Sequence, residues 1–154
     1  MTLAREMALE SEYVMGTFAR KPVEFVEGHG MTLIDDAGNE YLDFLSGIGV
    51  CSLGHCHPSI VQAVSDQAAK LIHVSNYYYI EHRGEVAQLL SNMLNAYVDE
   101  PSPETWKTFF ANSGAEANEG AIKCARKYSV DTYGESRNKV ITLVNSFHGR
   151  TLAT

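Results

Sequence analysis

The stretch that decides the fold is "FFANSGAEANEGAIKCARKY", Phe109 to Tyr128, in which an apolar segment meets a helix-like segment across a short turn. That turn carries only small side chains, those of Ser113, Gly114 and Ala115. Two interpretations are open. The turn is a plain connection that needs little room, or it is a phosphate seat, because a helix N-terminus offers unpaired N–H groups and a partial positive charge.

The residues around this turn predict the start of an α/β domain. We expect a strand over Thr105 to Ala111, a helix over Gly114 to Tyr128 and a second strand over Val140 to Val144. Strand–helix–strand spacing of this kind is typical of a parallel βαβ unit. The turns that follow the two strands would then lie at one edge of the sheet, where open α/β sheets bind their ligands.

The preceding residues predict a small α+β segment. Apolar residues and helix formers indicate three helices, and period-two patterns between turn residues indicate three strands of an antiparallel meander. The expected helices are Leu3–Met15, Pro58–Leu71 and Glu81–Tyr97, and the expected strands are Val23–Val26, Met31–Ile34 and Tyr41–Leu45. Gly47, Gly49 and Gly54 predict a flexible, close-fitting loop. The proline-containing linker 99–104 divides an N-terminal part, 1–98, from the α/β part, 99–154.

Composition narrows the class of protein. The chain has 154 residues, 45% of them hydrophobic, and a formal net charge of -7, which argues against a nucleic-acid or anionic membrane partner. No apolar run approaches the roughly 20 residues of a membrane span. The acidic residues near the N-terminus do not fit a signal peptide, and three sparse cysteines favour a reducing, cytoplasmic setting. The chain stops at Thr154 where another helix is expected, so we expect a fragment of a longer protein.

Some constellations have simpler explanations than a site. Cys51, His55, Cys56 and His57 invite a zinc interpretation, but three consecutive residues do not converge easily on one ion and no second ligand pair stands out, so we expect no metal. The run Tyr77 to Tyr79 is better explained by packing at a subunit interface. Two glutamates fall in the first turns of the helix after the small-residue turn, where the helix dipole favours acids without catalysis: Glu116 and Glu119.

A second loop, "SFHGRT", adds two candidate site residues to the small-residue turn. Phe147 offers an aromatic face on which a planar ring can stack, and Arg150 offers a fork suited to a carboxylate or phosphate. Taken singly, Phe147 is more simply explained as a core residue and Arg150 as a solvated charge. Together with the first turn, they describe a site for pyridoxal phosphate that holds an amino acid.

The chain resembles the N-terminal portion of the class III pyridoxal-phosphate-dependent aminotransferases, most closely the members that use acetylornithine. The resemblance rests on "YLDFLSGIGVCSLGHCHPSIVQAV", "HVSNYYY", "FFANSGAEANEGAIKCARKY" and "SFHGRT", in this order and spacing. It implies an aspartate-aminotransferase-like fold, of which the chain would hold an α+β segment and the beginning of the large parallel-sheet domain. It also implies a homodimer whose active sites draw on both subunits.

The resemblance implies roles for particular residues. Ser113, Gly114 and Ala115 would hold the phosphate of pyridoxal 5'-phosphate, although many relatives have threonine in the third position. Phe147 would stack on the pyridine ring, and Arg150 would bind the α-carboxylate of the substrate. Two further segments are implied to form part of the substrate pocket and to lie near the dimer interface, respectively: Gly47–Val50 and Asn76–Tyr79.

The cofactor-bearing lysine and the aspartate of the pyridine nitrogen are implied to lie beyond residue 154. None of the lysines present fits that position, and Lys123 and Lys127 are expected to be surface charges, so we expect these residues alone to be inactive. The implied reaction moves an amino group from an N-acetylornithine-like donor to 2-oxoglutarate. Ornithine, succinylornithine and 4-aminobutyrate are alternative donors, and a non-catalytic phosphate-binding or dimerisation module is the alternative from another class.

Overall fold

The computed structural model describes residues 2–98 and 106–154, which fall into two compact units, Met1–Tyr78 and Tyr79–Thr154. The expected domain boundary at residues 98 and 99 borders the segment 99–105, outside the described residues, and stays a prediction. The linker 99–104 lies in that same segment.

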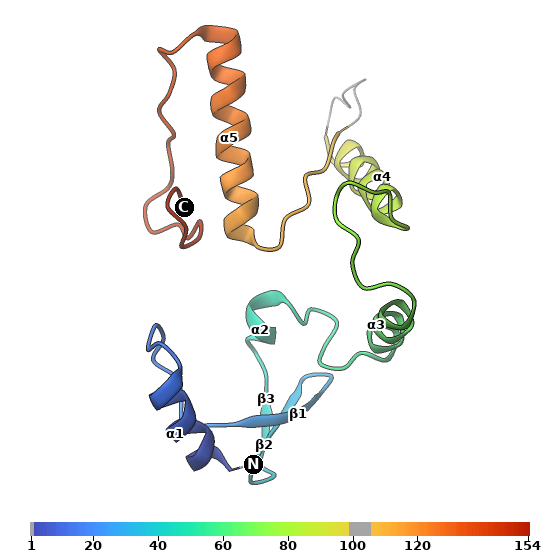
Figure 1. Cartoon of the computed structure of the whole chain (residues 1–154), viewed down its shortest axis with the longest axis vertical. Helices are drawn as coiled ribbons and strands as arrows, with labels where there is room; N and C mark the ends of the chain where they lie inside the picture. The colour runs from blue at the N-terminus through green and yellow to red at the C-terminus, as the bar shows by residue number, and fades with distance from the viewer. Residues whose placement is uncertain (1, 99–105) are drawn as a thin grey trace. The chain divides into compact units, whose positions relative to one another are not determined.

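The first unit holds helix α1 (Leu3–Tyr13) and an antiparallel sheet in the order β1-β2-β3 (Figure 1). The strands are β1 (Phe25–His29), β2 (Thr32–Asp35) and β3 (Glu40–Leu42). The predicted meander is therefore confirmed, but its first strand begins and ends later than predicted. The pairing of His29 with Thr32 across a tight turn sets these bounds, and the pairing register is a tertiary property that residue preferences do not fix.

The turn between β2 and β3 is organised by the carboxylate of Asp35, which is only 7% exposed. It accepts hydrogen bonds from the backbone N–H of Ala37 (3.0 Å) and Asn39 (2.8 Å), the Asn39 amide (2.9 Å) and the Tyr41 hydroxyl (2.9 Å). Asp36, the next residue, accepts from the N–H of Leu3 at 2.9 Å and so ties α1 to the hairpin. These polar contacts order the β2–β3 turn and connect it to α1.

The glycine-containing loop after β3 fits closely at Gly54, as predicted, because a Cβ there would lie 2.9 Å from the carbonyl oxygen of Gly30. It includes the short turn α2 (Ser46–Gly49), whose residues all have positive φ, including Ile48 at 59°. Left-handed backbone is unfavourable for a branched residue and persists only where other contacts hold it. Asp43 supplies such contacts: its Oδ1 accepts from the N–H of Leu45 (2.8 Å) and Ser46 (2.9 Å), and its Oδ2 lies 2.6 Å from His55 Nε2.

Three longer helices follow, and the sequence predicted all of them. They are α3 (Pro58–Lys70), α4 (Arg83–Ala96) and α5 (Gly114–Tyr133). α4 begins two residues later than predicted because His82, at φ 66°, is left-handed and cannot continue a right-handed helix. α5 runs five residues past the predicted end, to Tyr133, and Gly134, the next residue, ends it with a φ of 73°.

The two strands predicted for the α/β part are not formed within the described residues. Residues 106–111 and 140–144 are not assigned as strands, and Thr105 lies outside the described part. A strand is defined by a hydrogen-bonded ladder, and the only ladders in the described residues join β1, β2 and β3. The apolar composition of these segments identified candidate sheet strands, but neither segment has a hydrogen-bonded neighbouring strand among the described residues.

No hydrophobic residue among the described ones is buried. The apolar stripes predicted for α3 and α4 lie open, with Val64 63% and Leu89 62% exposed. None of the helices described is long and apolar enough to cross a membrane. The apolar stripes are therefore surfaces suited to packing, but the described residues do not pack against them.

Candidate functional site

Ser113 lies immediately before α5 and caps it. Its backbone is extended (φ −153°), and its Oγ accepts a hydrogen bond from the N–H of Glu116 at 3.2 Å. Glu116 in turn accepts from the N–H of Asn112 at 2.7 Å, which makes a close variant of the capping box. Because the Ser113 hydroxyl is an acceptor in this contact, its hydrogen remains available for a ligand.

The two residues after Ser113 give the turn the properties of an anion seat. Gly114 and Ala115 occupy the first two helical positions, whose N–H groups have no acceptor within the helix. α5 is 20 residues long, so its dipole places partial positive charge at this end. Apart from the adjacent residues and the backbone of its own helix, a Cβ placed on Gly114 would meet no protein atom within 4 Å, so the space beside its backbone is open.

The second loop lies directly against the first turn of α5, in the stretch where the end of the chain runs back along that helix (Figure 1). A Cβ on Gly149 would come within 2.6 Å of the Ala115 Cβ and 2.9 Å of its Cα, so only a glycine allows this approach. The Asn118 amide donates to the carbonyl oxygen of His148 at 2.7 Å. The structure thus brings together the two loops that the sequence singled out separately.

The two candidate side chains of the second loop are close to each other. Phe147 is 77% exposed, and the guanidinium carbon of Arg150 lies 5.8 Å from the centre of its ring, within cation–π range. A planar cofactor stacked on this ring would have a cationic fork beside it.

Glu119 is a residue of this site that sequence reasoning treated only as a helix-dipole acid. Its Oε1 accepts from the Thr151 hydroxyl at 2.5 Å and from the N–H of Ala153 at 3.3 Å. The Thr151 hydrogen bond, more than any other contact, holds the pKa of the Glu119 carboxyl below its usual value. A signal was present, because Ala115, Asn118 and Glu119 are spaced i, i+3 and i+4 and so share one helix face.

Other candidates are not drawn into this site. Lys123 and Lys127 are 78% and 75% exposed, as expected of surface charges. Lys127 pairs with Asp131 on the same helix. In the part of the chain that the structure describes, no group of three potential ligands is arranged to hold a metal ion.

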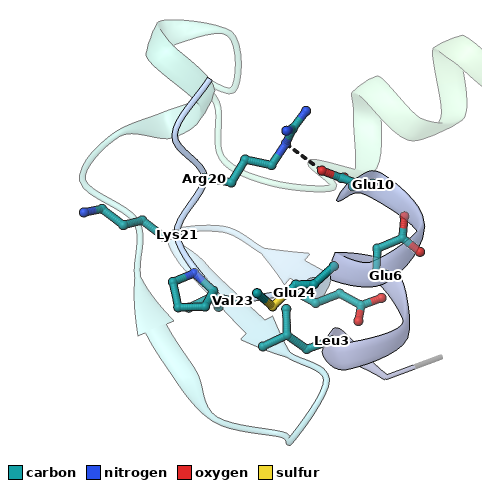
Figure 2. A pocket seen from close by; sticks show the side chains of 9 residues that line it. Leu3, Glu6, Glu10, Arg20, Lys21, Val23 and Glu24 are labelled. Carbon is teal, nitrogen blue, oxygen red and sulfur yellow. Dashed lines mark ion pairs between the residues drawn. The ribbon is translucent and has the colours of Figure 1, made fainter. Parts of the chain in front are cut away.

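The first unit contains a cavity of about 400 Å³ that no sequence pattern indicated (Figure 2). It lies between α1 and the segment leading into β1, and an ion pair joins Arg20 Nε to Glu10 at 2.8 Å beside it. The lining residues are Leu3, Glu6, Met7, Glu10, Arg20, Lys21, Pro22, Val23 and Glu24. None of them is among the predicted site residues.

Comparison with known proteins shows which family and which relatives this chain is similar to. The family model described as "Aminotransferase class-III" matches residues 17–154. Acetylornithine aminotransferase from Caldanaerobacter subterraneus subsp. tengcongensis is 52% identical over 142 residues, which are 92% of this chain and 34% of that protein. Its counterpart from Haemophilus ducreyi is 46% identical over 100% of this chain and 37% of its own length. The chain therefore spans about a third of the curated relatives it matches.

Solved structures agree with the sequence matches. Ornithine aminotransferase from Toxoplasma gondii superposes with a TM-score of 0.84 at 32% identity, covering 98% of this chain and 34% of that one. N-acetylornithine aminotransferase from Stenotrophomonas maltophilia gives 0.76 at 35% identity, with 93% and 36% coverage. A second Toxoplasma gondii structure, with a TM-score of 0.77 at 30% identity over 97% of this chain and 34% of that one, reports partial occupancy of PLP at its active site. Over the part it covers, the chain has the fold of these enzymes, and the family points to pyridoxal 5'-phosphate as cofactor.

Proposed function

This chain belongs to the class III aminotransferases, and we propose that the protein containing it transfers an amino group from N-acetylornithine to 2-oxoglutarate, a step of arginine biosynthesis. The names of the curated relatives, at 46% to 52% identity for the two described above, support this donor. The products would be N-acetylglutamate 5-semialdehyde and glutamate. We further propose a cytoplasmic homodimer.

The contact between Gly149 and Ala115 is the observation that carries the site proposal, because it joins the phosphate turn to the loop bearing Phe147 and Arg150. The described residues fit pyridoxal 5'-phosphate: unpaired helix amides and a hydroxyl donor suit its phosphate, and the exposed ring of Phe147 suits its pyridine. When bound, the cofactor supplies an electron sink for the chemistry at the substrate's α-carbon or its equivalent.

The residues of this chain would bind and orient. Ser113 donates its hydroxyl hydrogen to the phosphate, and the N–H groups of Gly114 and Ala115 complete the seat. Phe147 covers one face of the ring and keeps water from it. Arg150 fixes a substrate carboxylate through paired charge-assisted hydrogen bonds, which aligns the bond to be broken with the ring. The lysine that carries the cofactor would come from outside residues 1–154.

Ornithine is the second candidate donor, favoured by the TM-score of 0.84 with an ornithine aminotransferase. The deciding experiment measures kcat/KM of the full-length protein for N-acetylornithine and for ornithine, each with 2-oxoglutarate. We expect the acetylated donor to have the higher value by about ten-fold or more, because a site built to hydrogen-bond an acyl group rejects the analogue that lacks it. A higher value for ornithine would replace the proposed donor, and no turnover of either would refute the proposed reaction.

A further inference from the structure

The face of α5 behind the phosphate turn contacts the second loop at three successive places. Ala115 lies against Gly149, Asn118 donates to the His148 carbonyl at 2.7 Å, and Glu119 accepts from Thr151 and Ala153. Three of the four residues from His148 to Thr151 therefore contact α5, and we call these contacts the anchors of the loop. Arg150, the fourth, lies between two anchored residues. The loop backbone is therefore located by α5.

We infer that Asn118 and Glu119 are positioning residues, which set the separation between the phosphate seat and the side chains of Phe147 and Arg150. The inference rests on the proposed function. Phe147 directly precedes an anchored residue, and Arg150 lies between two of them. Both side chains are themselves exposed, so the anchored backbone decides where they project.

The geometry of the ligand gives the separation its importance. The phosphate and the ring of pyridoxal 5'-phosphate belong to one small molecule, so the seat and the stacking face must be a fixed distance apart. A displacement of about 1 Å in a positioned group is enough to cost a large part of its contribution. Contacts that hold the loop to the helix bearing the seat therefore act on cofactor affinity without touching the cofactor.

Glu119 suits this role because of its surroundings. Its side chain is 21% exposed, and the hydrogen bonds from Thr151 and Ala153 both depend on its carboxylate. The Asn118 amide is half-buried and bonds to a main-chain carbonyl, so its contact constrains the loop backbone directly. Thr151 also contacts the Thr154 hydroxyl at 2.7 Å, which continues the network beyond the loop.

The test uses the full-length protein and compares Glu119→Ala and Thr151→Val with wild type. Each variant removes one partner of the hydrogen bond between the Thr151 hydroxyl and the Glu119 carboxylate, the shortest of the contacts between the loop and α5. Thr151→Ser keeps the hydroxyl and is the rescue variant. Asp131→Ala is the matched control, because it removes an exposed acid and its ion pair from the same helix without touching the loop.

We expect the dissociation constant for pyridoxal 5'-phosphate to rise about ten-fold in Glu119→Ala and Thr151→Val, the worth of one hydrogen bond to a charged group. Thr151→Ser and Asp131→Ala should stay within about two-fold of wild type on the same reasoning. The circular dichroism of the bound cofactor, measured in its own absorption band, should weaken in the first two variants. A structural role alone would lower the folded fraction without changing this signal per bound cofactor.

The outcomes separate this inference from the proposed function. A wild-type protein that binds no pyridoxal 5'-phosphate refutes the proposed function itself. A wild type that binds it, with folded Glu119→Ala and Thr151→Val binding equally well, overturns the positioning role alone. If Glu119→Ala does not fold, the Thr151→Val and Thr151→Ser pair decides, since the two variants differ chiefly in the hydroxyl that contacts Glu119.

Discussion

The open space beside Gly114 makes this residue the sharpest probe of the phosphate seat. A glycine is usually essential because its backbone has a positive φ or because a side chain would collide with protein atoms. A Cβ at Gly114 meets none within 4 Å, and the residue lies in a right-handed helix that any amino acid can adopt. A substitution there therefore acts on an incoming ligand more than on the fold.

Gly114→Val should weaken cofactor binding in the full-length protein more than Ser113→Ala does. The branched side chain blocks the close approach of a phosphate to the backbone, whereas the alanine removes one hydroxyl among several donors. Titration with pyridoxal 5'-phosphate measures both dissociation constants, after circular dichroism has verified folding. Equal affinity of Gly114→Val and wild type would show that the turn is only a connection.

Phe147→Ala should loosen the cofactor by about 1 kcal/mol beyond the lost burial, the usual worth of one stacked aromatic pair. Phe147→Tyr, which keeps the ring, is the matched control and should bind nearly as tightly as wild type. The readout is again the dissociation constant of the cofactor. If Phe147→Ala leaves it unchanged in a folded protein, the ring does not stack on the cofactor.

Arg150→Ala should raise KM for both the amino acid and the oxo acid while the cofactor stays bound. Losing charge-assisted, paired hydrogen bonds to a carboxylate costs about 1.5–3 kcal/mol, or ten-fold to a hundred-fold in KM. Arg150→Lys keeps the charge without the planar guanidinium, so its KM values should lie between those of wild type and Arg150→Ala. Unchanged KM values for both substrates would remove Arg150 from the substrate site.

At the scale of elements, the sequence predicted helices well and strands of the second unit poorly, for one physical reason. A helix satisfies its own hydrogen bonds, so the apolar spacing of Pro58 to Lys70 was enough to identify it. Residues 140–144 have strand composition, but a ladder needs a neighbour that composition does not identify. Likewise, the glycines of α2 signalled an unusual loop, but its left-handed backbone depends on the hydrogen bonds of Asp43, which precedes it.

The turn between β2 and β3 gives a prediction about pH. The Asn39 side chain, followed by other donors, holds the pKa of Asp35 below the ordinary aspartate value of 3.8. Between the folded pKa and 3.8, Asp35 binds a proton more readily in the unfolded chain than in the folded turn, so the turn gains stability as pH rises. The contribution is fully present above 3.8 and is lost as pH falls through the lower, folded pKa.

Hydrogen exchange of the Ala37 and Asn39 amides, followed from about pH 5 to pH 2, measures this effect. We expect their protection in the full-length protein to hold down to pH 3.8 and to fall below it, whereas Asp35→Asn should lack that step. The backbone amides of His29 and Thr32, which flank the β1–β2 turn, serve as the internal control. Loss of protection that begins well above pH 3.8 would mean that a group other than Asp35 controls the turn.

At the scale of the whole molecule, the described residues expose the apolar surfaces that their sequence patterns predicted would be buried. The dimer interface predicted for Asn76 to Tyr79 has the exposure that such a role requires, with Tyr77 94% and Tyr79 101% exposed. The helix faces of α3 and α4 are open in the same way. Periodicity thus identified which side chains need partners, but the partners themselves cannot be derived from these residues.

Residues 1–154 produced alone should bind a hydrophobic dye strongly and catalyse no transamination. The physical reason is that no hydrophobic side chain among the described residues is buried, and the candidate site contains no desolvated lysine. Dye fluorescence and turnover of N-acetylornithine, compared at equal molar concentration with the full-length protein, test both points. Weak dye binding with cooperative thermal unfolding, or measurable turnover, would contradict this expectation.

The approach of Gly149 to Ala115 restricts how the protein can evolve. Position 149 has a φ of 143°, which L-residues rarely adopt, and its missing side chain is the space that Ala115 fills. Enlarging residue 149 is therefore blocked both by this backbone angle and by the Cα of residue 115 at 2.9 Å, and shrinking residue 115 removes neither barrier. A library that randomises both positions and selects for growth should return glycine at 149 with every residue tolerated at 115. Changes in substrate choice must then come from positions other than residue 149.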